Sequence, residues 1–122
     1  MNLQDKTIVI TGGGQGLGRT MALSFAKSGA NIALIDLNEE LLKESVSLVA
    51  QEGVKANYYL ANVSVESEVE STFKQINADF DGIDGLVNNA GILRDGMFVK
   101  AKDGVVSKKM SLESFQSVID VN

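Results

Sequence analysis

Short apolar runs alternate with amphipathic helical patterns along most of the chain. Continuous apolar and β-branched runs predict strands that are covered on both faces, whereas apolar residues spaced by three and four predict helices with one buried side. The predicted strands are 7–11, 32–36, 56–60 and 83–88. This alternation is typical of βαβ units, so the sequence predicts an α/β fold with a parallel sheet.

The helices predicted between these strands have recognisable ends. The first begins near Leu17 and stops at Ser28-Gly29, where glycine can adopt the left-handed backbone of a helix end. The second follows Asn38, whose side chain can cap a helix, and is stopped by Gly53. Ser64 is the predicted cap of the third helix. At 122 residues the chain is one domain at most.

The junction between the first strand and the first helix is rich in glycine. Five of the seven positions from Gly12 to Gly18 are glycine. Glycine permits positive φ and lets a ligand approach the backbone closely. Free N–H groups at the start of a helix favour an anion such as a pyrophosphate. A plain turn needs only one or two glycines, so we interpret the junction as a phosphate-binding loop.

The spacing of the glycines distinguishes between known nucleotide loops. A GxGxxG fingerprint fails in every register, because Leu17, Arg19 or Met21 stands at its last glycine. A GxxxxGK[ST] loop starting at Gly13 matches at Thr20, but Arg19 replaces its lysine. A planar guanidinium is a poor substitute for the compact ammonium group that reaches the terminal phosphates. The pattern that fits at every position is TGxxxGxG, matched by Thr11, Gly12, Gly16 and Gly18.

With this loop the sequence resembles the short-chain dehydrogenase/reductase family, whose cofactor loop has the form TGxxxGxG. The resemblance implies a doubly wound parallel sheet of the Rossmann type that binds a nicotinamide dinucleotide. Residues 1–122 would form the N-terminal part of that single domain, with about four of the family's seven strands. The loop residues that the resemblance places at the cofactor are Gly12, Gln15, Gly16, Leu17 and Gly18.

Asp36 closes the second predicted strand, 18 residues after Gly18. This is close to the ~20 residues expected for the acid that hydrogen-bonds the adenosine ribose of NAD. A carboxylate there repels a 2′-phosphate, and the neighbouring Leu37, also an expected cofactor contact, adds no positive charge. NAD(H) is therefore favoured, with NADP(H) the alternative. Arg19 could assist a 2′-phosphate, but a solvated helical arginine is the favoured interpretation, and Asp36 alone could merely cap the next turn.

Two later segments also resemble the family. Asn62-Val63 stands where relatives usually carry Asp-Val beside the adenine amino group. The amide oxygen of Asn62 can accept the same hydrogen bond, although an asparagine that only turns the chain fits equally well. Asn88-Asn89-Ala90-Gly91 matches the NNAG motif at the end of the fourth strand. The resemblance implies that Asn88 ties adjacent strands together, while Asn89, Ala90 and Gly91 run beside the adenosine half of the cofactor.

The stretch 92–97 resembles the segment after NNAG in 3-oxoacyl-[acyl-carrier-protein] reductases. Residues 98–109 are longer than usual in that group and rich in lysine, including Lys100 and Lys109. We interpret them as a solvated surface loop, with a patch for an acidic carrier protein or cofactor as the alternative. An apolar stripe after Ser111 predicts a helix that ends in Asn122, where relatives carry a catalytic asparagine.

Composition excludes several classes of function. A net charge of −5 argues against a nucleic-acid partner. The sequence has no cysteine and no histidine, so disulfides and the commonest metal ligands are absent, and we expect no metal site. No apolar run approaches the ~20 residues of a membrane span, so no membrane partner is expected and a cytoplasmic location is the default.

The resemblance implies an oxidoreductase that transfers a hydride between NAD(H) and a carbonyl or secondary alcohol. The expected activity is that of a 3-oxoacyl-[acyl-carrier-protein] reductase of fatty acid biosynthesis, acting as a homo-oligomer, by resemblance a tetramer, on a small molecule or an acyl thioester carried by its carrier protein. The family's serine and Tyr-x-x-x-Lys are not in the sequence, and Tyr58 and Tyr59 are interpreted as packing residues. We therefore expect these 122 residues alone to be inactive. The alternatives are a noncatalytic NAD-binding module and, remotely, a P-loop phosphoryl-transfer protein.

Overall fold

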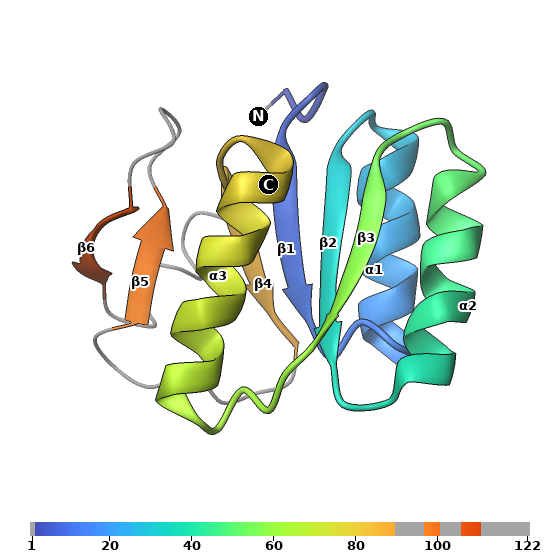
Figure 1. The fold of residues 1–122 in the computed structure, drawn as a ribbon. Coiled ribbons are helices and arrows are strands. Elements are labelled where there is room, and N and C mark those ends of the chain that lie inside the picture. The colour runs from blue at the N-terminus through green and yellow to red at the C-terminus, as the bar shows by residue number, and fades with distance from the viewer. Residues whose placement is uncertain (1, 90–96, 101–105, 111–122) are drawn as a thin grey trace.

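The computed structural model describes residues 2–89, 97–100 and 106–110 (Figure 1). Strands and helices alternate along the first of these ranges, as the sequence predicts. The elements are β1 (Thr7–Thr11), α1 (Gly16–Lys27), β2 (Asn31–Asp36), α2 (Glu39–Ala50), β3 (Ala56–Leu60), α3 (Glu66–Phe80) and β4 (Gly85–Asn88), followed by β5 (Met97–Lys100) and β6 (Val106–Met110).

The sheet has the order β3-β2-β1-β4, and every neighbouring pair in it is parallel. Helices α1 and α2 cover one face and α3 covers the other (Figure 1). All five residues of β1 are buried, which agrees with its continuous apolar sequence. The predicted α/β fold with a doubly wound parallel sheet is confirmed.

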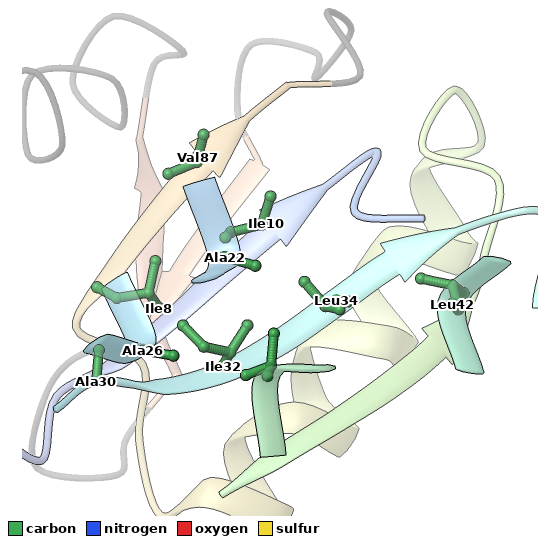
Figure 2. Close-up of a cluster of buried hydrophobic side chains, with 10 residues drawn as sticks. Ile8, Ile10, Ala22, Ala26, Ala30, Ile32, Leu34, Leu42 and Val87 are labelled. Carbon is green, nitrogen blue, oxygen red and sulfur yellow. The ribbon is translucent and has the colours of Figure 1, made fainter. Parts of the chain in front are cut away.

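Successive side chains of β1 pack into two separate apolar clusters. Ile8 and Ile10 face α1 and α2, where the small side chains of Ala22 and Ala26 let α1 lie close to the sheet (Figure 2). Val9 points to the opposite face and packs with the apolar stripe of α3. Burying one such aliphatic side chain contributes about 1.5–3 kcal/mol to stability. The two clusters therefore fix β1 as the rigid centre of the sheet.

The strand order reverses beside β1. The chain leaves β1 toward β2 and β3 on one side, and α3 then returns it to β4 on the other side. Thr11 at the end of β1 consequently lies in register between Ile35 and Asn88. In open α/β sheets a ligand crevice forms at such a reversal, outside the carboxyl ends of the strands. At this edge the glycine-rich junction follows β1, Asp36 is the last residue of β2, and Asn88 is the last residue of β4.

Two predicted boundaries were wrong. The third helix is capped by Val65 without any side-chain hydrogen bond, whereas the predicted cap, Ser64, directs its hydroxyl to Asn62 Oδ1 at 2.6 Å. The fourth strand begins at Gly85, not at residue 83. Asp84 still bonds to β1 through its backbone, because its N–H donates to the Thr7 carbonyl at 2.9 Å, while its carboxylate accepts the Thr7 N–H at 2.9 Å.

The lysine-rich stretch was predicted to be a loop, and this was wrong in part. β5 and β6 pair in an antiparallel sheet of their own, with an irregularity between Phe98 and Lys100, and β5 lies beside α3. In the sequence an Asp-Gly pair at 103–104 stands between these two segments, and such a pair is a recognised hairpin signal. The helix predicted after Ser111 lies outside the described residues.

The cap of α2 is where the sequence predicted it. Asn38 Oδ1 accepts the Leu41 N–H at 3.0 Å, and Glu39 and Glu40 occupy the positive first turn. We expect Asn38→Ala to lower the free energy of unfolding of the full-length protein by about 1 kcal/mol, because an orphan N–H loses its acceptor. Urea unfolding measures this, with Asn38→Asp as the control that keeps the cap. Equal midpoints for the two variants would contradict the assignment.

Candidate dinucleotide-binding site

The glycine loop joins β1 to α1 at the carboxyl edge of the sheet. Gly12 and Gly16 have φ of 67° and 59°, a region that residues with a Cβ rarely adopt. The Gly12 N–H donates to the Ile35 carbonyl at 2.7 Å and so holds the start of the loop on β2. A Cβ added to Gly16 would meet no atom within 4 Å. The loop is therefore anchored at its start and open at Gly16, where a ligand can approach the backbone.

Gly18 is required for a different reason, which is close packing. A Cβ at this position would lie 2.1 Å from the Gly12 carbonyl oxygen and 2.9 Å from Asn89 Nδ2. Asn89 Nδ2 itself donates to the same Gly12 oxygen at 3.1 Å. The start of α1, the loop and the residue after β4 thus meet at one point, and only glycine fits between them.

The N-terminus of α1 is left available to an anion. Its N-cap, Gln15, makes no side-chain hydrogen bond to the helix, and the first turn contains no acidic residue. By contrast α2 has the Asn38 cap and two glutamates in its first turn. The unpaired N–H groups and the positive end of the helix dipole therefore stay free at α1. This arrangement fits a pyrophosphate group.

Asp36 lies between the glycine loop and the chain that continues after β2. Its Oδ2 accepts the Gly14 N–H at 3.0 Å, and its Oδ1 accepts the Leu37 N–H at 2.7 Å. The next helix is capped by Asn38 and not by Asp36. Each carboxylate oxygen keeps a further lone pair, which can accept a hydroxyl such as that of a ribose. Two backbone donors hold the carboxylate in place for that role.

Arg19 is not the solvated helical arginine that the sequence favoured. Its side chain is only 23% exposed and forms an ion pair with Glu44 at 3.2 Å. Its Nε donates to Ser45 Oγ at 2.8 Å, and its Nη2 donates to the Gly14 carbonyl at 2.7 Å. The interpretation of Arg19 as solvated was wrong because α2 packs beside α1 and supplies Glu44 and Ser45 as partners, which spacing along α1 alone does not reveal. Sequence reasoning also missed Ser45, which stands in an otherwise apolar stripe.

The two large apolar side chains that are most exposed among the described residues lie at the site. Leu17 is 64% exposed at the start of α1, and Leu37 is 68% exposed just after Asp36. Both were predicted to contact a cofactor, and their exposed surfaces are available to one. Val63, after β3, is partly buried against the cluster under α3. These residues line the same carboxyl edge of the sheet.

Asn62 behaves as a turn-forming asparagine. Its Oδ1 accepts both the N–H and the hydroxyl of Ser64, at 3.0 and 2.6 Å, and its own N–H donates to Glu68. These bonds favour the turn alternative, so an adenine group would have to share the amide oxygen.

Asn88 ties β4 to β1, because its Oδ1 accepts the Thr11 hydroxyl at 3.0 Å. No described residue accepts from the buried Asn88 Nδ2.

Comparison with known protein families identifies the family of this chain. Residues 6–122 match the family model for short chain dehydrogenases. The chain belongs to the short-chain dehydrogenase family.

Similar short-chain dehydrogenases come from several bacteria. A 2,5-dichloro-2,5-cyclohexadiene-1,4-diol dehydrogenase of Sphingobium indicum is 36% identical over 99% of this chain and 44% of its own length. A 3-oxoacyl-[acyl-carrier-protein] reductase of Chlamydia muridarum is also 36% identical, over 98% of this chain and 45% of its own. The chain thus spans under half the length of these curated relatives.

A solved structure of the family has the same arrangement of strands and helices. The crystal structure of an NAD⁺-bound xylitol dehydrogenase superposes with a TM-score of 0.72 and 37% sequence identity. The match covers 80% of this chain and 37% of the other. Three site residues predicted for this short-chain dehydrogenase, Ala90, Gly91 and Asn122, lie outside the described residues.

Neither tyrosine of this short-chain dehydrogenase sequence is suited to proton transfer. Tyr59 donates to Asp79 Oδ2 at 2.7 Å, and burial raises the pKa of its hydroxyl, with this hydrogen bond adding to the effect. Tyr58 donates to Glu39 Oε2 at 2.8 Å, which raises its pKa as well. Both hydroxyls therefore stay neutral at physiological pH, and both rings pack against the core clusters.

Two further features are absent from the part of the chain that the structure describes. That part contains no cluster of three or more acidic residues placed to bind a metal ion. It also has no helix that is long and apolar enough to cross a membrane.

Proposed function

We propose that the full-length protein is an oxidoreductase that binds NAD(H) and transfers a hydride between it and a carbonyl or secondary alcohol. The observation that carries the proposal is the TGxxxGxG loop, which leads into the uncapped N-terminus of α1 and faces the Asp36 carboxylate. The NAD⁺-bound xylitol dehydrogenase of the same fold supports it. When bound, the nicotinamide supplies or takes up the hydride.

Different residues would bind different parts of the cofactor. The loop from Gly12 to Gly18 and the first turn of α1 would hold the pyrophosphate, and Asp36 would accept hydroxyls of the adenosine ribose. Leu37, Asn62 and Val63 would border the adenine. Asn89 fixes the loop through Gly12 and, with Ala90 and Gly91, would run beside the adenosine half. Gln15 and Leu17 complete the loop side, and Asn122 would contribute to proton transfer.

The charges at the site support NAD(H) over NADP(H). Asp36 places a negative charge where a 2′-phosphate would lie, so NADP(H) would bring like charges together. Arg19, the nearby cation that could compensate, is paired with Glu44 and bonded to the Gly14 carbonyl. The carboxylate is therefore left to act on the ribose without a cation directed toward the cofactor.

The relatives suggest two substrate classes. We favour reduction of a 3-oxoacyl thioester on an acyl carrier protein, because the Chlamydia muridarum reductase is 36% identical and the stretch after NNAG is similar to such enzymes. Oxidation of a cyclic secondary alcohol is the second candidate, because the diol dehydrogenase is equally similar. Both classes use the same hydride transfer in opposite directions.

Assaying the full-length protein tests this function. We expect NADH-dependent reduction of an acetoacetyl thioester well above the rate without enzyme. Replacing the tyrosine of a downstream Tyr-x-x-x-Lys with phenylalanine should abolish turnover while NADH still binds, because that change removes only the proton donor. NADH binding without turnover of either substrate class would indicate a noncatalytic module. Absence of NADH binding would contradict the proposal as a whole.

A further inference from the structure

Gly14 is held by side chains on both sides of its Cα. Its N–H donates to Asp36 Oδ2 at 3.0 Å. Its carbonyl oxygen accepts Arg19 Nη2 at 2.7 Å and Ser45 Oγ at 2.9 Å. Glycine has the greatest backbone freedom of any residue, so a glycine held by three hydrogen bonds is fixed by its surroundings and not by its own conformational preference.

Ser45 is the unusual member of this group. It lies in the middle of α2, its side chain is 0% exposed, and it shares the buried side of the helix with Leu42 and Val49. Serine is a poor helix former, and a buried hydroxyl is costly unless it is hydrogen-bonded. The Ser45 hydroxyl donates to the Gly14 carbonyl and accepts from Arg19 Nε at 2.8 Å. The hydroxyl thus donates to the glycine loop and accepts from α1.

Arg19 completes the connection between α1, α2 and the loop. Besides Ser45 and Gly14 it bonds the Leu41 carbonyl and pairs with Glu44, each at 3.2 Å. Its guanidinium is two hydrogen bonds from the Asp36 carboxylate, by way of Gly14.

We propose that Ser45 and Arg19 are positioning residues that set the preference for NAD(H) over NADP(H). By holding the Gly14 carbonyl they orient the Gly14 N–H, and this N–H holds the Asp36 carboxylate toward the ribose. Holding Arg19 against α2 also keeps its positive charge from a 2′-phosphate. The inference rests on the proposed function, because it assigns the source of that site's cofactor preference.

The test compares binding of NADH and NADPH by fluorescence titration of the full-length protein. We expect Ser45→Ala to raise the Kd for NADH about threefold to tenfold, the value of a lost hydrogen bond. The Kd for NADPH should stay unchanged or fall, so the preference for NADH over NADPH narrows. Ser47→Ala is the matched control, because Ser47 is exposed on the same helix. If the role of Ser45 is purely structural, Ser45→Ala will raise the Kd values for NADH and NADPH by the same factor. An unchanged ratio of the two Kd values would therefore overturn the inference.

A double-variant comparison tests whether Ser45 acts through Asp36. In an Asp36→Ala background, Ser45→Ala should no longer change the ratio of the two Kd values. A change as large as that in the wild type would show that Asp36 is not the intermediary. If Ser45→Ala fails to fold, Arg19→Lys replaces it. That variant keeps the positive charge but replaces the fixed fork of Nε and Nη2 with a single ammonium on a flexible stem, which should hold the Gly14 carbonyl less firmly, so the preference for NADH over NADPH should again narrow.

The outcomes separate this inference from the proposed function. Binding of neither dinucleotide by the wild type would refute the function and, with it, the inference. A wild type that prefers NADH while Ser45→Ala and Arg19→Lys keep the full preference would refute the inference alone. A wild type that binds both cofactors equally would refute both the role of Asp36 and its positioning, but not dinucleotide binding.

Discussion

Replacing Gly18 with valine is expected to weaken NADH binding roughly a hundredfold or more in the full-length protein. The Cβ alone would lie 2.1 Å from the Gly12 carbonyl oxygen, a backbone atom, and 2.9 Å from Asn89 Nδ2. The obstacle cannot rotate away as a flexible side chain would, so the loop or the start of α1 must shift. Both hold the proposed pyrophosphate site. Fluorescence titration with NADH measures the loss, and circular dichroism shows whether the variant remains folded.

Two other glycines, one in the loop and one remote from it, separate loss of NADH affinity from a general loss of stability. Gly16 in the loop and Gly53 after α2 both have positive φ, at 59° and 87°, and an added Cβ meets nothing within 4 Å at either. Alanine should therefore cost each about 1–2 kcal/mol of stability through backbone strain. Only Gly16→Ala should also lose NADH affinity. A folded Gly18→Val protein that titrates like the wild type would show that the glycine loop is not the phosphate site.

Removing the carboxylate of Asp36 should have the second largest effect. We expect the wild type to prefer NADH in kcat/KM and Asp36→Ala to narrow that preference at least about tenfold. A like charge about 4 Å from a 2′-phosphate costs ~1 kcal/mol in water and ~4 kcal/mol near a protein surface, and each 1.4 kcal/mol is a factor of ten. The variant should therefore gain NADPH activity while it loses the acceptor for the ribose hydroxyl.

Asp36→Asn separates the two contributions of this residue. The amide keeps one oxygen that can accept a hydroxyl but has no charge to repel a phosphate. It should gain NADPH activity like the alanine variant and retain more NADH activity. Steady-state kinetics with both cofactors checks this. An equal or reversed preference in the wild type, or an unchanged ratio in Asp36→Ala, would contradict the assignment of Asp36.

Local sequence signals predicted the elements that depend on them alone. The buried strand β1 was predicted from its unbroken apolar run, and the Asn38 cap from residue type and position. Ser64 was wrongly chosen as a cap because the neighbouring Asn62 competes for its hydroxyl, and both choices satisfy the same local rule. Periodicity thus located the third helix, but it could not decide which polar residue would begin it.

Contacts between distant segments could not be predicted in the same way. Arg19 and Ser45 are 26 residues apart and meet only because α1 and α2 pack on the same face of the sheet. The glycine pattern located the loop, and the family resemblance identified Asp36, yet neither indicated that Gly14 is held from α2. A serine in an apolar stripe was the one available signal, because a buried hydroxyl requires partners.

The position of β4 bears on the order in which the molecule folds. β1, α1 and β2 are neighbours along the chain, whereas β4 joins β1 through contacts that span 77 residues, among them Thr7 with Asp84 and Gly12 with Asn89. Closing so long a loop is entropically costly and slow, so we expect β4 to pair late. The Gly12 carbonyl would receive its Asn89 donor only then. The proposed dinucleotide site would thus be completed late in folding, and a nascent chain synthesised only as far as β3 would have the glycine loop without this support.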